Sequence, residues 1–220
     1  MTRRNAAVAS MSLAAVGLAV AGFGSFTGAE NAGLAEALDM ESAIVAPSYS
    51  VDSVHSGAIF SIRHAGVSNF HGRFDALNGE FTFDPADPSG GTFKAEIPVE
   101  SVNTGNEKRD GHLKAADFFN AKQYPVVTFE STGVSPTGET NVFDLSGDLT
   151  MHGVTKPIEA KMTWIGTGEF RGKPVAGLEA SFSIKRSDFG ITTYLAPDGG
   201  EGGGLGNTVN VTIFVEAAQQ

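Results

Sequence analysis

Residues 142–151 read VFDLSGDLTM, a segment in which every second position is apolar or glycine. One phase comprises Phe143, Leu145, Gly147, Leu149 and Met151, and the other phase is mostly polar. Successive side chains of a β-strand point to opposite faces of its sheet. This alternation therefore predicts a strand with one dry face and one wet face.

The same alternation recurs between Tyr49 and Val215, and it predicts an all-β domain. Further strands are expected at residues 58–64, 72–83, 93–99, 127–131, 158–164, 176–184 and 209–215. In the second of these the apolar phase slips by one residue near Asn78, which predicts a β-bulge. Strands of this number hide their edges by closing into a barrel or by stacking as a sandwich. A barrel of about eight strands can hold one small ligand.

Two segments interrupt the alternation. Residues 84–91 are rich in proline and glycine and are predicted to form a turn. In residues 103–120, apolar residues recur at helical spacing from Leu113 onward, and Asn106 precedes a charged run typical of a helix start. We therefore expect one short helix that caps an end of the barrel.

The N-terminal residues 1–29 have the order of a secretory signal peptide. Arg3 and Arg4 form a basic start, an uncharged run rich in alanine and valine follows, and small residues at 27–29 or at 19–21 offer a cleavage site. An uncleaved membrane anchor is the alternative, because the apolar run approaches the length that spans a bilayer. Residues 30–47 are expected to form a linker and residues 48–217 the barrel domain, in a periplasmic or secreted protein.

The composition excludes several classes of function. The chain has 220 residues, a formal net charge of -10 and no cysteine. A negative surface does not favour phosphate backbones, so no nucleic-acid partner is predicted. The lack of cysteine excludes disulfides, thiolate metal sites, cysteine nucleophiles and a lipoprotein anchor.

The histidines do not have the spacing of a metal site. They are His55, His64, His71, His112 and His152, with no pair at the spacing of one helical turn and no His-x-His. The sequence therefore predicts no metal ligands. His55 and His152 are expected to make structural hydrogen bonds at strand ends. His64 lies on an inward phase and is a candidate contact for a ligand head group.

Catalytic motifs are not evident either. Asp52, His55 and Ser56 lie close together in sequence, but no G-x-S-x-G motif accompanies them. The glycine-rich residues 199–206 lack the Lys-Ser/Thr ending of a phosphate-binding loop and are expected to form a flexible lid. No catalytic residues are predicted, and the protein is not expected to be an enzyme.

Phenylalanine dominates the aromatic residues, with 16 Phe against 3 Tyr and 1 Trp. A Phe-rich interior with few polar tips suits a hydrocarbon ligand, although such residues can also simply fill a core. The residues expected to line a tunnel are Phe60, Ile62, His64, Phe74, Phe81, Phe93, Phe129, Phe143, Trp164 and Phe182. Room for a ligand is expected beside the small inward residues Ala58, Gly72, Ala95, Gly147, Ala160 and Ala180.

Several blocks of the chain, in this order, resemble segments of the YceI-like family. They are VDSVHS at 51–56, FSIRH at 60–64, HL at 112–113, DFF at 117–119, YP at 124–125, TFES at 128–131, GDLTMHGVTK at 147–156 and RSDFG at 186–190. The resemblance covers about residues 49–216. It implies an extended eight-stranded antiparallel lipocalin-like β-barrel, usually exported, and no generally accepted catalytic residues.

The resemblance also implies a ligand, namely a polyisoprenoid such as an isoprenoid quinone or a prenyl phosphate, held in the tunnel for transport or storage. No cofactor other than this lipid is expected. The alternatives are an exported stress or envelope interaction protein in which the lipid is structural, and an enzyme acting on a prenyl lipid. Besides the lipid, the partners considered are a membrane surface met during lipid exchange and a second copy of the chain.

Overall fold

The computed structural model describes residues 46–220. The predicted signal peptide lies outside these residues, and of the predicted linker only Ala46 and Pro47 lie inside them. No helix in this part of the chain is long and apolar enough to span a membrane.

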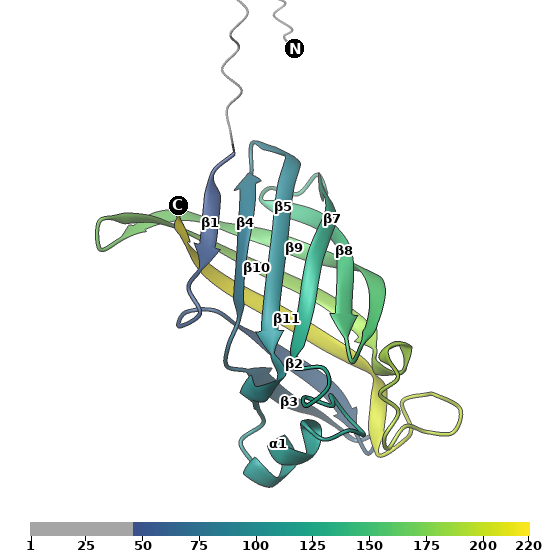
Figure 1. Cartoon of the computed structure of the whole chain (residues 1–220). Coiled ribbons are helices and arrows are strands. Elements are labelled where there is room, and N and C mark those ends of the chain that lie inside the picture. Colours follow the sequence, from purple (N-terminus) through teal and green to yellow (C-terminus); the bar gives the residue numbers. More distant parts are fainter. Residues whose placement is uncertain (1–45) are drawn as a thin grey trace, which may run out of the picture. The chain divides into compact units, whose positions relative to one another are not determined.

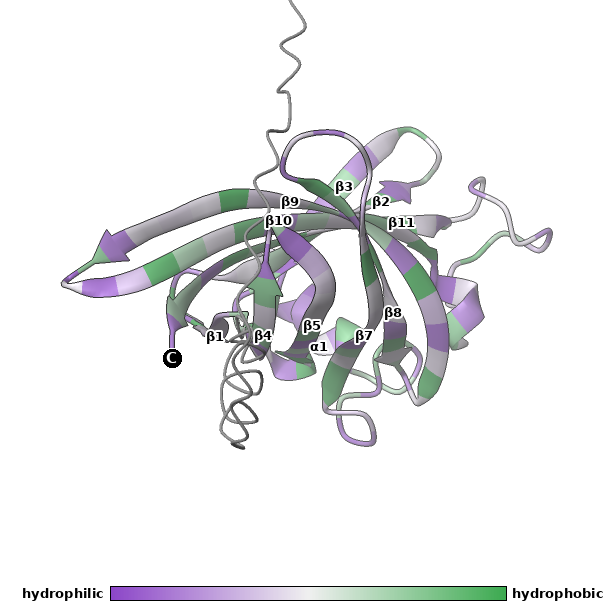
Figure 2. Ribbon diagram, turned by 90° about the horizontal axis from the view of Figure 1, so that it is seen from above, coloured by the Kyte–Doolittle hydropathy of each residue, from purple (hydrophilic) through white to green (hydrophobic). Residues whose placement is uncertain are grey.

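The described part of the chain is almost entirely β-structure (Figure 1). Its elements are β1 (Ser48–Val51), β2 (Gly57–His64), β3 (Ser68–Phe74), β4 (Asn78–Asp84), β5 (Asp87–Pro98), η1 (Val99–Ser101), β6 (Val102–Asn103), α1 (Glu107–Leu113), β7 (Val126–Pro136), β8 (Val142–Met151), β9 (Val154–Phe170), β10 (Lys173–Lys185), η2 (Arg186–Phe189) and β11 (Leu205–Gln219). The β9–β10 hairpin extends beyond the other strands (Figure 2).

Eight of the strands close into an antiparallel ring in the order β1-β4-β5-β7-β8-β9-β10-β11, with β11 pairing back to β1. Closure is made by Tyr49 opposite Gln219 and Val51 opposite Ala217. The predicted eight-stranded antiparallel barrel is confirmed, and the sandwich is excluded. The ring leaves no open edge over these pairings, which is how a closed barrel avoids edge-to-edge association.

One end of the barrel is closed by different strands. Residues Leu205 to Phe214 of β11 pair with β2, and β3 pairs with β2 on its other side. β3 then pairs with β6, through Arg73 opposite Asn103 and Phe74 opposite Val102. Because β6 follows β5 after one short 3-10 helix, β2 and β3 bridge the wall between β11 and the end of β5.

The single strand predicted at residues 72–83 is wrong. The chain leaves β3 after Phe74 and starts β4 at Asn78, and β4 pairs with β1 and β5 instead of β2. Leu77 lies in the connection between β3 and β4, and its side chain is buried, with 1% exposed. The slip in apolar phase therefore marks a change of strand, not a bulge. The predicted turn at residues 84–91 is also too long, since β5 begins at Asp87.

The predicted helix is α1, at the end of the barrel where β2 and β3 lie (Figure 1). The Oδ1 atom of Asn106 accepts a hydrogen bond of 3.0 Å from the backbone N–H of Arg109. This is a helix N-cap, which satisfies a backbone donor that the first turn would otherwise leave unpaired. The expectation of one short helix at a barrel end is thus confirmed.

The β8–β9 hairpin turns on two residues with positive φ, His152 at 52° and Gly153 at 76°. Such a pair matches the right-handed twist of the flanking strands. A Cβ atom on Gly153 would lie 2.5 Å from the ring of Tyr124, so glycine is required there. The Nδ1–H of His152 donates to the carbonyl of Phe189 at 2.9 Å, which confirms its structural role at a strand end.

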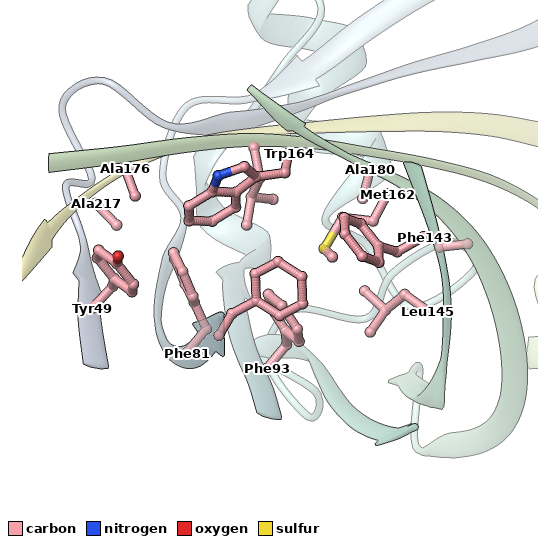
Figure 3. Close-up of a cluster of buried hydrophobic side chains, with 13 residues drawn as sticks. Tyr49, Phe81, Phe93, Phe143, Leu145, Met162, Trp164, Ala176, Ala180 and Ala217 are labelled. Atoms are coloured by element: carbon pink, nitrogen blue, oxygen red, sulfur yellow. The ribbon is translucent and has the colours of Figure 1, made fainter. Parts of the chain in front are cut away.

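The barrel interior contains two apolar clusters. Figure 3 shows the first, which includes Tyr49, Phe81, Phe83, Phe93, Phe143, Leu145, Met162, Trp164 and small residues of β9, β10 and β11. Phe83 and Met162 are fully buried, and the ring of Phe83 meets that of Phe143 edge to face at 5.1 Å. The second cluster lies toward α1 and contains Val99, Phe118, Ala121, Val127, Leu149, Met151, Phe189 and Ile191.

Candidate ligand-binding site

Two adjoining cavities lie inside the barrel. The helix-end cavity, of about 170 Å³, is bordered by β2, β3, α1 and the chain that follows α1, and by parts of β5, β7, β8, β10, η2 and β11. The mid-barrel cavity, of about 90 Å³, lies between β4, β5, β7 and β8 on one side and β9, β10 and β11 on the other. The residues that border both are Ile97, Val127, Leu149, Phe182 and Ile213. The cavities are therefore neighbours along the barrel.

The walls of both cavities are predominantly apolar. In the helix-end cavity the polar lining residues are Arg109 and Arg186. In the mid-barrel cavity they are Glu80, Lys94 and Thr128. An apolar interior with few polar groups suits a long hydrocarbon with a small polar head.

The structure divides the predicted lining residues into three groups. Phe60, Ile62 and Phe74 border the helix-end cavity, Phe81, Phe93 and Phe129 border the mid-barrel cavity, and Phe182 borders both. His64 lies at the surface, on the rim of the helix end. Phe143 and Trp164 pack inside the first cluster and border neither cavity. Contact of these ten residues with a ligand stays a prediction.

Many lining residues that sequence reasoning missed come from the strands themselves, for example Ile184, Val209 and Val211. Two further groups come from outside the strands. Leu113, Phe118 and Phe119 reach the helix-end cavity from α1 and the chain after it. Arg109 and Arg186 reach it as cations. A helical apolar pattern marked the first group as buried. The two arginines carried no such signal, because periodicity does not report where a long charged side chain ends.

Room for a ligand comes from alanines more than from glycines. Ala58 borders the helix-end cavity, and Ala95, Ala160 and Ala180 border the mid-barrel cavity. Gly72 and Gly147 border neither, because phenylalanine rings cover them. A Cβ atom on Gly72 would lie 2.3 Å from the ring of Phe60. A Cβ atom on Gly147 would lie 2.3 Å from the ring of Phe129. The expectation that these two glycines leave space for a ligand is wrong.

A hollow of about 570 Å³ at the helix end, called the mouth below, adjoins the helix-end cavity. The residues common to both are Arg109, Leu113, Phe118 and Leu205. The remaining rim is formed by His64, Asn106, Lys108, His112, Tyr194 and Gly204. The glycine-rich segment 199–206 thus reaches the mouth, and its proposed role as a lid stays a prediction.

Arg186 is a buried cation, 4% exposed, in the wall of the helix-end cavity. Its guanidinium donates to the carbonyls of Gly206 at 2.7 Å, Leu205 at 3.0 Å, Ile191 at 3.1 Å and Thr193 at 2.8 Å. Burial lowers the pKa of Arg186, and the negative charge of Glu201 opposes this. The side chain ties the chain after η2 to the start of β11.

Asp52, His55 and Glu216 form an exposed cluster where the β1–β2 loop meets β11. His55 Nδ1 lies 2.9 Å from Asp52 Oδ2 and 3.8 Å from Glu216 Oε1. Both carboxylates thus lie near the same ring nitrogen. The hydrogen bond with Asp52 confirms the predicted hydrogen bonding of His55. The hydrogen bond with Asp52 raises the pKa of His55, and the same bond lowers the pKa of Asp52. The prediction that no metal binds this chain stays a prediction.

We expect the stabilising effect of this cluster to depend on pH. The pKa of His55 is raised above 6.5, so its contribution is complete below that value and is lost as the pH rises through the higher, folded-state pKa. The pKa of Asp52 is lowered below 3.8, so its contribution is lost as the pH falls through the lowered value. NMR titration of the His55 ring should give a pKa that falls when Asp52 is replaced by asparagine. An unchanged pKa in Asp52→Asn would contradict the assignment.

A closed antiparallel barrel with a mainly apolar interior cavity and one polar mouth defines a class of small-ligand-binding barrels. A family model described as "YceI-like domain" matches residues 49–217 of this chain. Protein YceI of Escherichia coli is 41% identical over 180 residues, which cover 80% of this chain and 89% of that protein. The chain belongs to the YceI-like family.

Solved structures show the same fold. The YCEI protein of Campylobacter jejuni superposes with a TM-score of 0.62 at 33% identity, over 70% of this chain and 87% of that chain. A polyisoprenoid binding domain from Saccharophagus degradans gives a TM-score of 0.59 at 20% identity, over 79% of this chain and 99% of that chain. At that identity the second likeness concerns the fold alone.

Proposed function

We propose that this protein is an exported carrier or store for a long polyisoprenoid, held in the two adjoining cavities. The observation that carries the proposal is their shared apolar wall, with Phe182 at the junction. A prenyl chain matches such a wall because it is apolar along its whole length. The name of the Saccharophagus degradans neighbour, a polyisoprenoid binding domain, supports the same ligand class.

The energetics favour a long chain over a short one. Burial of each five-carbon unit gains about 4 kcal/mol before costs, at about 0.8 kcal/mol per carbon group. Ordering the chain and losing its free rotation offset much of this gain. Several units are therefore required for tight retention, which a ligand extending through both cavities would supply.

Export, and exchange of the lipid at a membrane surface, form part of the proposal. The mouth supports the second point. Tyr194 on its rim is 59% exposed, and Val67, in the turn beside His64, is 82% exposed. Exposed apolar side chains around an opening suit brief contact with lipid. We propose no catalytic residue, no metal and no cofactor other than the lipid.

The test is mass spectrometry of an organic extract from protein purified without detergent out of a host that makes prenyl lipids. The wild-type protein is expected to yield a prenyl lipid in near-stoichiometric amount. Phe60→Leu should yield less, because it removes ring contacts from the helix-end cavity while it keeps the site apolar.

An extract of the folded wild-type protein without any prenyl lipid would leave a packed core in place of a binding site. The alternative function, an exported stress or envelope protein with a structural lipid, predicts a different result. The lipid would then be present but would not exchange with added vesicles.

A further inference from the structure

We propose that the head group of the lipid is an anion, a phosphate or diphosphate, received at the mouth by Arg109 and Lys108. This inference rests on the proposed function and narrows its ligand class. The first observation is the charge of the mouth. Lys108 and Arg109 border it, and no carboxylate does so within residues 46–220. Two histidines, His64 and His112, also lie on the rim, and His112 is hydrogen-bonded to Asp117 just outside it. The whole chain has 25 acidic residues against 15 lysines and arginines, so a mouth with only positive formal charges departs from the rest of the protein.

Arg109 stands at the boundary between the mouth and the helix-end cavity, since it borders both. Its Nε donates to Thr104 Oγ1 at 2.7 Å, and its Nη2 donates to the Thr104 carbonyl at 2.6 Å. Its guanidinium lies over the ring of Phe70, 4.4 Å from the ring centre. The two hydrogen bonds to Thr104 thus hold one edge of the guanidinium, and the ring of Phe70 covers one of its faces.

In this fixed position the guanidinium of Arg109 keeps N–H donors that no protein group uses. Within the described residues, Nη1 of Arg109 has no hydrogen-bond partner and no carboxylate lies within ion-pair distance of the side chain. The nearby acids are engaged elsewhere. Asp110 accepts hydrogen bonds from the backbone N–H and hydroxyl of Thr104, and Asp117 is bonded to His112 at 2.8 Å. An oriented guanidinium with free N–H groups is suited to the oxygens of a phosphate.

The electrostatic field of the cavity wall also favours an anionic head group. Arg186 is the other charged residue of the helix-end cavity, and it uses its donors on four backbone carbonyls. The carboxylate of Glu201 acts on it electrostatically and offsets part of its positive charge, but within residues 46–220 the two do not form an ion pair. A quinone ring offers only neutral acceptors to these cations, whereas a phosphate offers a charge and more oxygens. The arrangement therefore favours the phosphorylated form of the lipid.

The experiment compares three ligands with one hydrocarbon tail: geranylgeranyl phosphate, geranylgeraniol, and a menaquinone that carries a geranylgeranyl chain. Each is titrated into delipidated full-length protein. The phosphate is expected to bind wild type about tenfold or more tightly than the alcohol and the quinone, the size of a charge-assisted hydrogen bond. Added salt should weaken binding of the phosphate and leave that of the alcohol nearly unchanged.

Arg109→Gln should remove most of the preference for the phosphate while the alcohol binds as before. Lys108→Gln is a second variant on the exposed surface of α1, expected to show a smaller loss in the same direction, and it serves if Arg109→Gln does not fold. Lys173→Gln, at the start of β10 and outside the mouth, is the matched control and should change neither ligand.

The outcomes separate this inference from the proposed function. Equal binding of phosphate, alcohol and quinone to wild type would overturn the anionic head group and leave the carrier function standing. Equal loss of phosphate and alcohol in Arg109→Gln would also overturn it, since the arginine would then only hold Thr104 in place. Failure of all three ligands to bind wild type would overturn the proposed function itself.

Discussion

Phe182→Asp is expected to abolish lipid retention. Phe182 is the aromatic residue that borders both cavities, and it packs against both apolar clusters. A carboxylate there faces apolar walls on both sides, where an unpaired charge is strongly disfavoured. A prenyl chain passing from one cavity to the other would have to cover that charge. We expect at least a tenfold drop in bound lipid, together with a loss of about 3 kcal/mol or more in stability.

Two variants on the same strand make the result specific. Ser181→Asp places the same charge on the exposed outer face of β10, opposite Lys161, and should retain both lipid and melting temperature. Phe182→Leu keeps the junction apolar and should reduce the bound lipid only in part. Lipid is quantified by mass spectrometry, and stability by denaturant unfolding of delipidated protein, because bound ligand itself stabilises the fold. Full lipid retention in a folded Phe182→Asp protein would show that the chain does not pass this point.

The alternation of apolar and polar residues was sufficient to predict the dry face of most strands. Phe81, Phe93, Phe143 and Phe182 all point inward, as their phase requires. Alternation does not, however, say which strand lies next to which. The slip before Gly79 has the same pattern whether the strand bulges or the chain crosses to another partner. Only the pairing of β4 with β1 and β5 distinguishes these two cases.

The candidate site illustrates the same limit at the level of side chains. Phe60 and Phe143 are both inward phenylalanines, yet Phe60 borders a cavity and Phe143 fills the first cluster. The difference arises from neighbours on other strands, because Phe143 meets Phe83 while Phe60 covers Gly72 and leaves space beyond its ring. Such contacts join residues far apart in sequence, so no local pattern encodes them.

Arg186 shows this limit more clearly. In the sequence, the RSDFG block at residues 186–190 that contains it indicates only a resemblance to the YceI-like family, and no role for the arginine. Its role depends on four carbonyls from two separate segments, residues 191–193 and 205–206, which converge on one guanidinium. Neither segment has a regular pattern of apolar residues that would predict this convergence. The buried cation in turn fixes the segments that border the helix-end cavity, including Ile191 and Leu205.

Arg186→Met is therefore expected to be among the most destabilising single changes in the barrel. Methionine fills a similar volume but leaves four backbone carbonyls without their donor in a largely buried setting. A buried hydrogen bond to a charged group contributes more than a neutral one, and its orphaned acceptors add a desolvation cost. We expect a loss of about 4 kcal/mol or more in the free energy of unfolding of delipidated protein.

The companion variants distinguish geometry from charge. Arg186→Lys keeps the positive charge but presents a single nitrogen, which cannot reach all four carbonyls, so it should recover only a minor part of the loss. Lys185→Met, one residue earlier and exposed, should stay within about 0.5 kcal/mol of wild type. If Arg186→Lys instead restored wild-type stability, charge alone would account for the effect, and the four-carbonyl clamp would not be what holds the two segments together. If the clamp does hold them, Arg186→Lys should also retain less lipid than wild type, because Ile191 and Leu205 would no longer be fixed at the cavity wall.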